Sequence, residues 1–238
     1  MRHFGRFAAL RGVTADFAPA RLYVLLGENG AGKSTLLRII AGLLAPSRGT
    51  VHVLGSSDIK SVATRFGYMG HAPLLYDEMS AVENLLYFSA LYGCSNRERC
   101  EEAIRTVGLD PTLERRVGQY SQGMRQRISL ARAIVHSPEL LFLDEPFSNV
   151  DIRSAKQMTS LLAKMRDQGT TIFVVTHQAA IMEPVTDECF VLDAGRLVAR
   201  EKGIPARLLT PYLAEERAAL QSQTLQSQSL QSQREAGE

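Results

Sequence analysis

A chain of 238 residues is long enough for one large α/β domain, or for such a domain with an inserted lobe. With 45% hydrophobic and 22% charged residues the composition is that of an ordinary globular protein, and a net charge of +2 is too small to indicate a nucleic-acid or lipid surface. No apolar run approaches the ~18 residues of a membrane span, and the first residues lack the apolar core of a secretory signal. Three cysteines without metal-ligand spacing, Cys94, Cys100 and Cys189, fit reduced thiols in the cytoplasm.

The first part of the chain offers little material for a sheet. Only residues 7–17 are available for strands beside the first buried one, so we expect an abbreviated start. Residues 22–26 form a short apolar run of the kind that is buried in a parallel sheet. Residues 34–41 follow as an amphipathic helix, which Gly42 is expected to end.

A glycine-rich loop joins this strand to this helix, and it matches the phosphate-loop pattern G-x-x-x-x-G-K-[ST]. Small residues let backbone N–H groups close around phosphate oxygens, and the helix dipole favours the same negative charge. We expect Lys33 to reach the β- and γ-phosphates and the Ser34 hydroxyl to coordinate Mg²⁺. A chance glycine-rich turn would not bring strand, loop, Lys-Ser and helix together in this order. The expected nucleotide-binding residues are Gly27, Glu28, Asn29, Gly30, Ala31, Gly32, Lys33, Ser34 and Thr35.

Helical patterns dominate the middle of the chain. Before them, residues 51–55 and 66–69 are two short strand candidates. The capping-box spacing occurs twice, at Ser80 with Glu83 and at Ser95 with Glu98. The chain therefore predicts a helical lobe over about 77–137, set into the α/β domain. Its last helix is expected to end at Ser137-Pro138, because proline disfavours helix in the residue before it.

Two further buried-strand patterns end in polar residues. Residues 140–143 run into Asp144 and Glu145, residues 171–175 run into Thr176 and His177, and a helix over about 153–167 lies between them. Residues 190–192 and 197–199 predict a hairpin. The sequence Leu-Gln-Ser-Gln occurs three times in steps of five residues, which cannot form one apolar stripe on a helix. We expect 215–238 to be a disordered extension.

In open α/β sheets ligands bind at the carboxyl ends of the strands, where the phosphate loop, Asp144-Glu145 and His177 all lie. Asp144 is expected to hold Mg²⁺ through a water, opposite Ser34. Glu145 is expected to orient or deprotonate the attacking water, and His177 to bond the γ-phosphate. The alternative, a solvated acidic pair that caps a loop, is weaker because four apolar residues precede Asp144 and Pro146 follows Glu145.

This order of motifs resembles the nucleotide-binding subunit of ATP-binding-cassette (ABC) transporters over about residues 4–200. Residues 121–127 resemble the family's signature sequence, residues 140–145 its Walker B strand, residues 148–151 its D-loop, and His177 its switch histidine. The resemblance implies a P-loop NTPase of the ABC type over 1–214. Such a fold is α/β, with a central, mostly parallel sheet, an antiparallel β portion and an inserted α-helical subdomain.

The resemblance also implies partners. Ser121 and Gly123 stand at the start of a predicted helix, whose N–H groups and dipole suit a γ-phosphate. In the family, that phosphate belongs to the facing subunit, so two identical or different ATPase chains enclose two ATP molecules, and Asp151 joins the nucleotide site. Integral membrane subunits are implied to dock on the helical lobe around 72–118. The chain is then a peripheral protein on the cytoplasmic face of the inner membrane, and no nucleic acid is expected.

Several positions depart from the family pattern. His71 stands where the Q-loop glutamine is usual, and since Mg²⁺ prefers oxygen ligands it either contacts water or occupies an exposed loop. Phe4 stands where an adenine-stacking tyrosine is usual, and it either stacks or packs on the sheet. Tyr120 and Gln122 replace the signature leucine and second glycine, while Ser121 and Gly123 are kept.

Residues 68–71 and 83–85 are similar to the heme-exporter ATP-binding subunits of cytochrome c biogenesis, so heme is the expected cargo. Exporters of drugs, lipids or polysaccharide have similar ATPase subunits and remain alternatives. A non-transport ABC ATPase of DNA repair or translation would normally show a second cassette or a long coiled coil. A P-loop kinase would need an acceptor site and would not need the Ser-Gln-Gly at 121–123.

Overall fold

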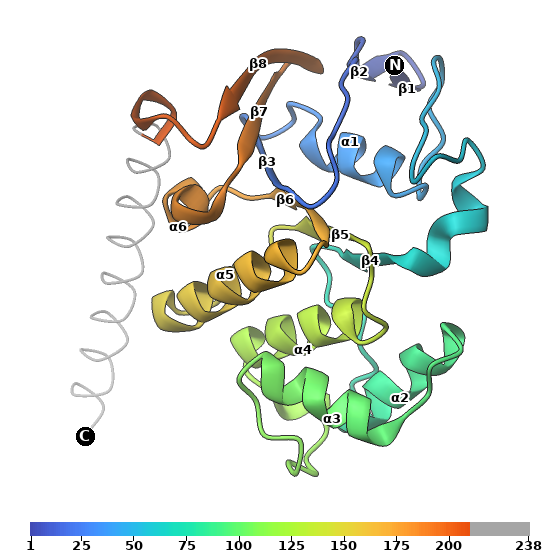
Figure 1. Ribbon diagram of the computed structural model, residues 1–238, viewed down its shortest axis with the longest axis vertical. Coiled ribbons are helices and arrows are strands. Elements are labelled where there is room, and N and C mark those ends of the chain that lie inside the picture. The colour runs from blue at the N-terminus through green and yellow to red at the C-terminus, as the bar shows by residue number, and fades with distance from the viewer. Residues whose placement is uncertain (210–238) are drawn as a thin grey trace, which may run out of the picture.

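A sheet of six strands forms the centre of the protein (Figure 1). The computed structural model describes residues 1–209, so the extension expected over 215–238 lies outside the described residues. The strand order is β4-β5-β6-β3-β7-β8, and every neighbouring pair is parallel except β7 with β8. The expected α/β fold with a mostly parallel sheet is confirmed. The strands of this sheet are β3 (Leu22–Leu26), β4 (Phe66–Met69), β5 (Leu140–Asp144), β6 (Thr171–Val175), β7 (Glu188–Asp193) and β8 (Arg196–Lys202).

An antiparallel β portion accompanies this sheet. At the N-terminus, β1 (Arg2–Phe4) and β2 (Phe7–Leu10) form a separate two-stranded sheet, and they are the only regular structure before β3. The expected hairpin is present as β7 and β8. Its two-residue turn, Ala194-Gly195, has positive φ at both positions, which matches the twist of the paired strands.

Helices cover both faces of the central sheet. The α-helices among residues 1–209 are α1 (Lys33–Ile40), α2 (Ala81–Leu91), α3 (Arg97–Thr106), α4 (Gln122–Ile134), α5 (Ile152–Asp167) and α6 (Ala179–Met182). Short 3₁₀ helices span Ile59–Arg65, Val117–Gln119 and Glu183–Val185. None of the helices in this part of the chain combines the length and the apolar character needed to cross a bilayer.

The two faces of the sheet belong to two separate cores, because successive side chains of a strand point to opposite sides. Along β3, Leu22, Val24 and Leu26 enter one hydrophobic cluster, while Tyr23 and Leu25 enter the other. The side chains of α1 fill the second cluster, and those of α4, α5 and α6 fill the first. The loop between β3 and α1 is therefore held between a fully buried strand and a helix packed on it.

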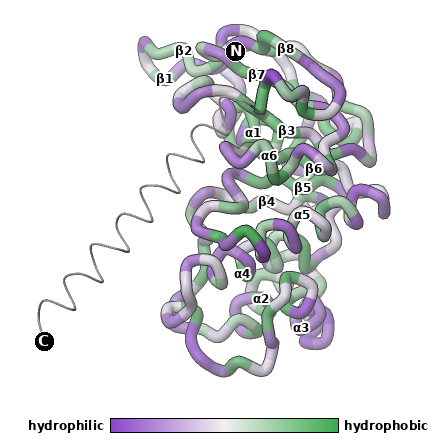
Figure 2. The backbone as a smooth tube through the Cα atoms, turned by 90° about the vertical axis from the view of Figure 1, so that its left-hand side faces the viewer, coloured by the Kyte–Doolittle hydropathy of each residue, from purple (hydrophilic) through white to green (hydrophobic). Residues whose placement is uncertain are grey.

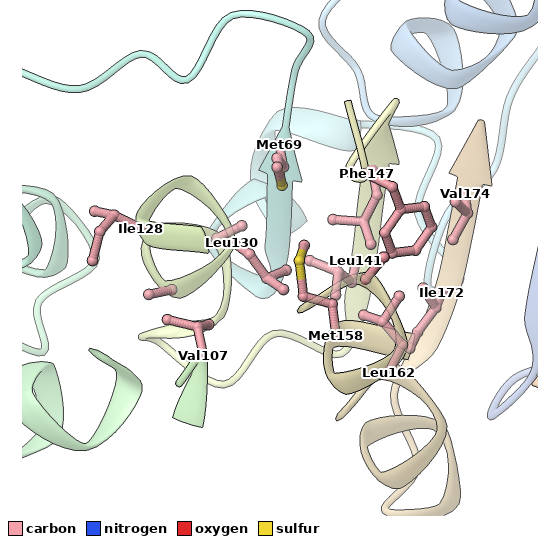
Figure 3. Close-up of a cluster of buried hydrophobic side chains, with 14 of the residues drawn as sticks. Met69, Val107, Ile128, Leu130, Leu141, Phe147, Met158, Leu162, Ile172 and Val174 are labelled. Atoms are coloured by element: carbon pink, nitrogen blue, oxygen red, sulfur yellow. The ribbon is translucent and has the colours of Figure 1, made fainter. Parts of the chain in front are cut away.

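The first cluster also connects the sheet to the predicted helical lobe. Figure 3 shows Met158 and Leu162 of α5 close to Leu141 of β5, and Leu130 of α4 on the other side of Met158. Helix α4 in turn contacts α2 and α3. These three helices lie together at the end of the molecule away from β1, β2 and β8 (Figure 2).

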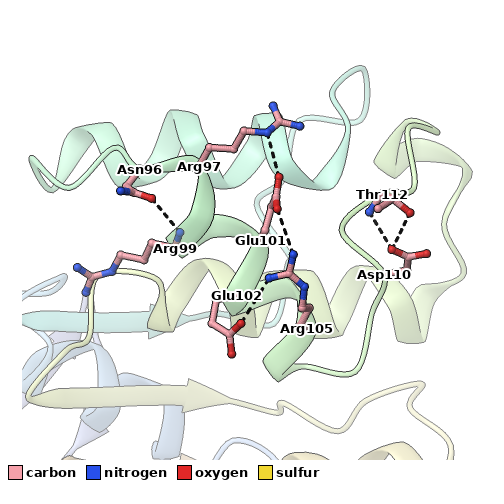
Figure 4. A network of polar contacts seen from close by, with 8 residues as sticks. All are labelled: Asn96, Arg97, Arg99, Glu101, Glu102, Arg105, Asp110 and Thr112. Atoms are coloured by element: carbon pink, nitrogen blue, oxygen red, sulfur yellow. Dashed lines mark hydrogen bonds and ion pairs between the residues drawn. The ribbon is translucent and has the colours of Figure 1, made fainter.

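The helix caps agree with one expected capping box and correct the other. The Ser80 side chain accepts from the Glu83 N–H, and the Glu83 carboxylate accepts from the Ser80 N–H. The second box, expected at Ser95, is wrong: Asn96 begins α3, and its Oδ1 accepts from the Arg99 N–H (Figure 4). An Asn side chain caps a helix as well as a Ser side chain does, so local spacing could not decide between adjacent candidates.

Two other expected boundaries are wrong. Residues 51–55 do not form a strand. Val53 and Ser56 close a tight turn through Leu54 and Gly55, both at positive φ, and no strand in the described part of the chain pairs with them. Helix α4 ends at Ile134, earlier than Ser137, which takes a left-handed conformation with φ of +53°.

Candidate active site

A cleft with a volume of about 770 Å³ lies at the carboxyl ends of β3, β5 and β6. The loop after β3, the loop after β5 and the loop after β6 each supply part of its wall. Most of the residues that the sequence singled out lie here. They are Phe4, Asn29, Gly30, Gly32, Lys33, Ser34, Thr35, His71, Asp144, Glu145 and His177.

The glycines of the loop between β3 and α1 have a geometric role. Gly27 has a φ of +140°, and a Cβ added there would lie 2.1 Å from the Leu192 carbonyl oxygen. Gly32 caps α1 with a φ of +103°, and a Cβ there would lie 2.7 Å from the Ala9 carbonyl oxygen. The loop can therefore keep this path only with glycine at these two positions. Glu28 and Ala31 belong to the same loop, and the Ala31 N–H donates to the Glu28 carbonyl.

We expect Gly27→Ala to lower the free energy of unfolding by about 2–4 kcal/mol, since the new methyl group meets fixed backbone at a left-handed position. Denaturant unfolding without nucleotide measures this. Gly30→Ala is the matched control in the same loop. Gly30 also has positive φ, but an added Cβ finds no atom within 4 Å, so its cost should stay near 1 kcal/mol. Equal losses in both variants would contradict the steric explanation.

Lys33 folds back over the loop that precedes it. Its ammonium donates to the carbonyls of Gly27 at 2.7 Å and Glu28 at 3.0 Å, and the side chain is buried. The amino group thus lies at the mouth of a helix N-terminus, where backbone N–H groups and the helix dipole already favour negative charge. The Lys33 ammonium, on a flexible side chain, and the N-terminus of α1, fixed by the backbone, are both positive and together suit a polyphosphate.

Oxygen atoms from two distant segments meet beside Lys33. The Ser34 hydroxyl donates to Asp144 Oδ1 at 2.7 Å, although 110 residues separate them in the chain. Asp144 is buried at the end of β5, and the Arg38 guanidinium lies 3.8 Å from its Oδ2. A hydrogen bond with the Tyr68 side chain and the charge of Asp144 raise the pKa of Arg38. A hydroxyl and a carboxylate are hard oxygen donors, so this pair fits the ligand preference of Mg²⁺.

Glu145 follows Asp144 but occupies a different environment. Its backbone has a φ of +55°, and its N–H donates to the Val175 carbonyl at 2.8 Å, so the side chain leaves the strand direction. The side chain is 18% exposed, and burial raises the pKa of this carboxyl to about 7, because removal from water penalises the charged form. A carboxyl with this pKa can take a proton near neutral pH.

His177 completes this part of the cleft. Its Nε2 lies 3.4 Å from Glu145 Oε1, and its backbone N–H donates to Glu145 Oε2 at 3.2 Å. Both residues therefore face the same space. The imidazole and the carboxylate are within reach of one small molecule bound between them and the loop at Lys33.

Phe4 and His71 line the outer wall. Phe4 is 47% exposed, and the Arg2 guanidinium lies 4.7 Å from its ring centre. It belongs to β1 of the separate two-stranded sheet and is not part of either hydrophobic cluster on the central sheet. His71 is exposed on the segment after β4. Both alternatives that the sequence left open for His71, a contact to water in the site and an exposed loop position, agree with this placement.

Six of the predicted nucleotide-binding residues do not line the cleft: Gly27, Glu28 and Ala31 of the loop after β3, and Ser121, Gly123 and Asp151 from elsewhere in the chain. Ser121 begins α4, and its Oγ accepts from the Met124 N–H at 3.3 Å. Asp151 begins α5 and accepts from the Ser154 N–H at 2.9 Å. A Cβ added to Gly123 would lie 3.2 Å from the Asn149 carbonyl oxygen, so the signature segment and the D-loop segment touch each other. Within one chain, Ser121, Gly123 and Asp151 therefore lie outside the cleft, although Ser148 at the start of the D-loop segment lines it.

The cleft also contains residues to which the sequence assigned no role in the site, among them Phe7, Arg38 and Gln178, and it contains Ser148 of the D-loop segment. Arg38 had a usable signal, because it lies four residues after Ser34 and so on the same side of α1. Phe7 had none: it reaches the cleft because β1 and β2 fold back beside the loop, and only tertiary structure decides that.

The family model for ABC transporters matches residues 10–148, more than half of the chain, and ends just beyond Glu145. The chain belongs to the ABC transporter family. This ABC ATPase is 36% identical over 199 residues to the ABC transporter ATP-binding protein NatA of Bacillus subtilis (strain 168), with 81% of each chain covered.

Two other curated relatives are longer than this ABC ATPase. The bacitracin transport ATP-binding protein BcrA of Bacillus licheniformis is 34% identical, over 74% of this chain and 59% of its own length. The daunorubicin/doxorubicin resistance ATP-binding protein DrrA of Streptomyces peucetius is 36% identical, over 80% of this chain and 60% of its own length. The ABC ATPase thus spans about three fifths of the length of these two relatives.

Solved structures agree with the family. The structure of an ATP-binding subunit of an ABC transporter has 28% identity and a TM-score of 0.77, and it covers 84% of this chain and 86% of that one. A dimeric ATP-binding cassette in a post-hydrolysis state, bound to ADP and Pi, has 25% identity and a TM-score of 0.76, with 82% and 91% covered. The protein is accordingly an ATP-hydrolysing enzyme with the P-loop NTPase fold of the ABC type.

Proposed function

We propose that this ABC ATPase powers export through separate integral membrane subunits. One observation carries the proposal: Lys33, the Ser34–Asp144 pair and the Glu145–His177 pair, from three loops, face one cleft. The groups in this cleft suit the chemistry of ATP. Energy supply is therefore its part in the transporter, and cargo binding belongs to the partner subunits.

The loop residues 27–35 would hold the phosphates of ATP, and Phe4 would stack on its adenine. Lys33 would turn from the carbonyls of Gly27 and Glu28 to the β- and γ-phosphates, which replace its present partners with charged ones. Ser34 and Asp144, which are hydrogen-bonded to each other, would hold Mg²⁺, and the ion would neutralise charge on the phosphates.

Glu145 would act as the base for the attacking water. As the water oxygen bonds to the γ-phosphorus, the bond to the bridging oxygen of ADP breaks, and the proton of the water passes to the Glu145 carboxylate. His177 would bond the γ-phosphate and, through its backbone N–H, keep the Glu145 carboxylate in place. His71, on the opposite wall, would contact a water in the site.

This role of Glu145 predicts a pH dependence. Its pKa of about 7 means that the carboxyl is mostly protonated below that pH and cannot accept a proton from water. We expect kcat/KM for ATP hydrolysis, which reports the free enzyme, to rise with pH through about 7, with one titrating group on the rising limb. Initial rates at ATP concentrations well below KM, between about pH 6 and pH 8, measure this. A flat profile over that range would contradict Glu145 as the base.

Ser121, Gly123 and Asp151 would act on the nucleotide of a second ATPase subunit. They lie outside the chain's own cleft, and Ser121 stands at the N-terminus of a helix long enough to favour phosphate there. One of the similar solved structures is a dimer. Two chains would then complete each other's sites, and each chain alone would hold two incomplete halves.

The part of the helical lobe around 72–118 would receive the membrane subunits, within an ATPase domain that spans 1–214. The surface around α2 supports this, because Tyr76 and Tyr87 are each 44% exposed and contact one another and Phe88. Leu74 and Leu91 extend the apolar character of that surface. Docked in this way, the protein would be peripheral to the membrane, on the cytoplasmic face of the inner membrane.

The relatives bear on the cargo. They are named for bacitracin transport and for daunorubicin and doxorubicin resistance, so we propose a bulky, amphipathic organic compound as the exported substrate. The comparisons do not support the heme cargo that residues 68–71 suggested. The alternative of a drug exporter fits the comparisons better. The proposed ATP hydrolysis by this chain is the same for either cargo.

Isolation of the complex from native membranes tests the proposal. We expect ATPase activity to co-purify with multi-span membrane proteins, in a particle with two ATPase subunits. A preparation that contains only soluble partners, or one that needs a phosphate acceptor other than water, would contradict a transport role. Binding of labelled anthracycline, peptide antibiotic and heme to the purified complex would then separate the cargo classes.

A further inference from the structure

One side of α4 carries a buried polar stripe. Gln126, Ser129 and Arg132 are spaced three residues apart, so they follow one side of the helix, and all three side chains are buried. Each donates a hydrogen bond to backbone carbonyls outside the helix. Burial of polar groups costs free energy unless hydrogen bonds compensate, and apolar side chains would fill these positions at lower cost. We therefore expect these three polar side chains to be needed for holding the segments that they bond in position.

The targets of the stripe are two segments of the cleft wall. Gln126 Nε2 donates to the Glu145 carbonyl at 3.0 Å. Ser129 Oγ donates to the Pro73 carbonyl at 3.0 Å, on the segment that follows β4. The first segment contains the proposed base, and the second contains His71.

Arg132 holds the second segment at both ends. Its Nη2 donates to the Tyr68 carbonyl at 3.1 Å, and its Nη1 donates to the Leu74 carbonyl at 3.4 Å. The guanidinium also lies 5.0 Å from the ring centre of Phe88 on α2, and burial lowers its pKa. His71 lies between the two bonded carbonyls, so its backbone has little freedom as long as Arg132 is in place.

From this geometry we infer that Arg132, assisted by Ser129, is a positioning residue that fixes His71 in the nucleotide cleft. The inference rests on the proposed function where it assigns His71 a part in hydrolysis. Because the same helix begins at Ser121, the stripe also joins the His71 segment to the surface proposed to meet the second subunit. A displacement of α4 along its axis would then move His71 relative to the phosphates.

Arg132→Lys tests the clamp in the full chain. Lysine keeps the charge but cannot bond two carbonyls with a planar fork, so amide hydrogen exchange over residues 70–74 should become about tenfold faster. Ser129→Ala removes one bond and should accelerate exchange in the same segment by about threefold. Hydrogen exchange with mass spectrometry measures both, and thermal unfolding of each variant shows that the fold is retained.

Arg99→Lys is the matched control. Arg99 also holds a carbonyl with its guanidinium, that of Val135 at the far end of α4, together with the Ser137 hydroxyl. It lies on α3 (Figure 4) and is not among the residues that line the cleft. Exchange over 70–74 should stay within about twofold of the wild type in this variant.

The effect on hydrolysis is tested in two backgrounds. Arg132→Lys should lower kcat about tenfold with little change in KM, and in the His71→Ala background its further effect should shrink below about twofold. A purely structural role would lower kcat by the same factor in both backgrounds. That result, or unchanged exchange over 70–74, overturns the inference. If His71→Ala alone leaves kcat intact, the proposed role of His71 fails and so does the catalytic half of the inference, while exchange still decides whether Arg132 holds the segment.

Discussion

Glu145→Gln should lower kcat for ATP hydrolysis by about 10²–10⁴-fold while ATP still binds, because the amide keeps the shape of the side chain but cannot take the proton of the attacking water. Bound ATP then persists, and since a second subunit is proposed to contact it through Ser121, the dimer should accumulate. Single-turnover kinetics measure the chemical step, and size-exclusion chromatography with ATP measures the dimer.

Glu139→Gln is the control for this substitution. Glu139 precedes the opposite end of β5, where it is exposed and paired with Arg65. Its replacement should leave kcat within about twofold of the wild type. A Glu145→Gln variant with a normal rate would exclude Glu145 as the base and leave water activation to another group in the cleft.

Glu145→Gln also reports on the burial of this carboxyl. Because the pKa of Glu145 is raised in the folded protein, folding takes up a proton between about pH 4.5 and about pH 7. The free energy of unfolding of the wild type therefore falls as pH rises through this range. Above this range the wild type bears the full cost of a buried carboxylate, on the order of 3 kcal/mol, which glutamine does not. The thermal midpoint Tm of Glu145→Gln should therefore exceed that of the wild type at about pH 8.

Lys33→Met should weaken ATP binding by about 100-fold, since methionine keeps the length of the side chain but removes the ammonium that is expected to meet the β- and γ-phosphates. Hydrolysis falls with it. Fluorescent-nucleotide titration measures the affinity. The two loop carbonyls of Gly27 and Glu28 also lose their donor, so Tm without nucleotide must be compared.

Lys60→Met provides the control for the loss of one positive charge. Lys60 is exposed on the 3₁₀ helix Ile59–Arg65, outside the cleft, and its replacement should not change ATP affinity by more than about twofold. If Lys33→Met folds normally and binds ATP as tightly as the wild type, the proposal that the Lys33 ammonium binds the phosphates is wrong.

Local pattern was sufficient for much of this protein. The loop at residues 27–35 could be located because its signal is contiguous: a buried strand, glycines, Lys-Ser and a helix. The strands that end at Asp144 and before His177 were visible for the same reason, since four or five apolar residues in a row followed by polar ones indicate a strand that leaves the core. The rule that ligands bind at the carboxyl ends of strands then placed these residues together.

Tertiary structure decided what depends on distant neighbours. Whether residues 51–55 form a strand depends on a partner strand, and no strand within residues 1–209 pairs with them. The raised pKa of Glu145 comes from desolvation, which the whole fold produces. The polar stripe of α4 is an ordinary amphipathic pattern in sequence, and its meaning appears only when its bonds to the carbonyls of Tyr68 and Leu74 are seen.

The division has a physical reason. Backbone conformation and the direction of an apolar face are set by residues a few positions apart, so a sequence reveals them directly. Contacts such as that of Ser34 with Asp144, and the loss of water around a carboxyl, arise only when segments far apart in the chain are packed against each other. The sequence by itself determined which chemical groups this ABC ATPase has and at which strand ends, and the fold decided which of them are buried, which are clamped, and which, like Ser121, face away from their own cleft.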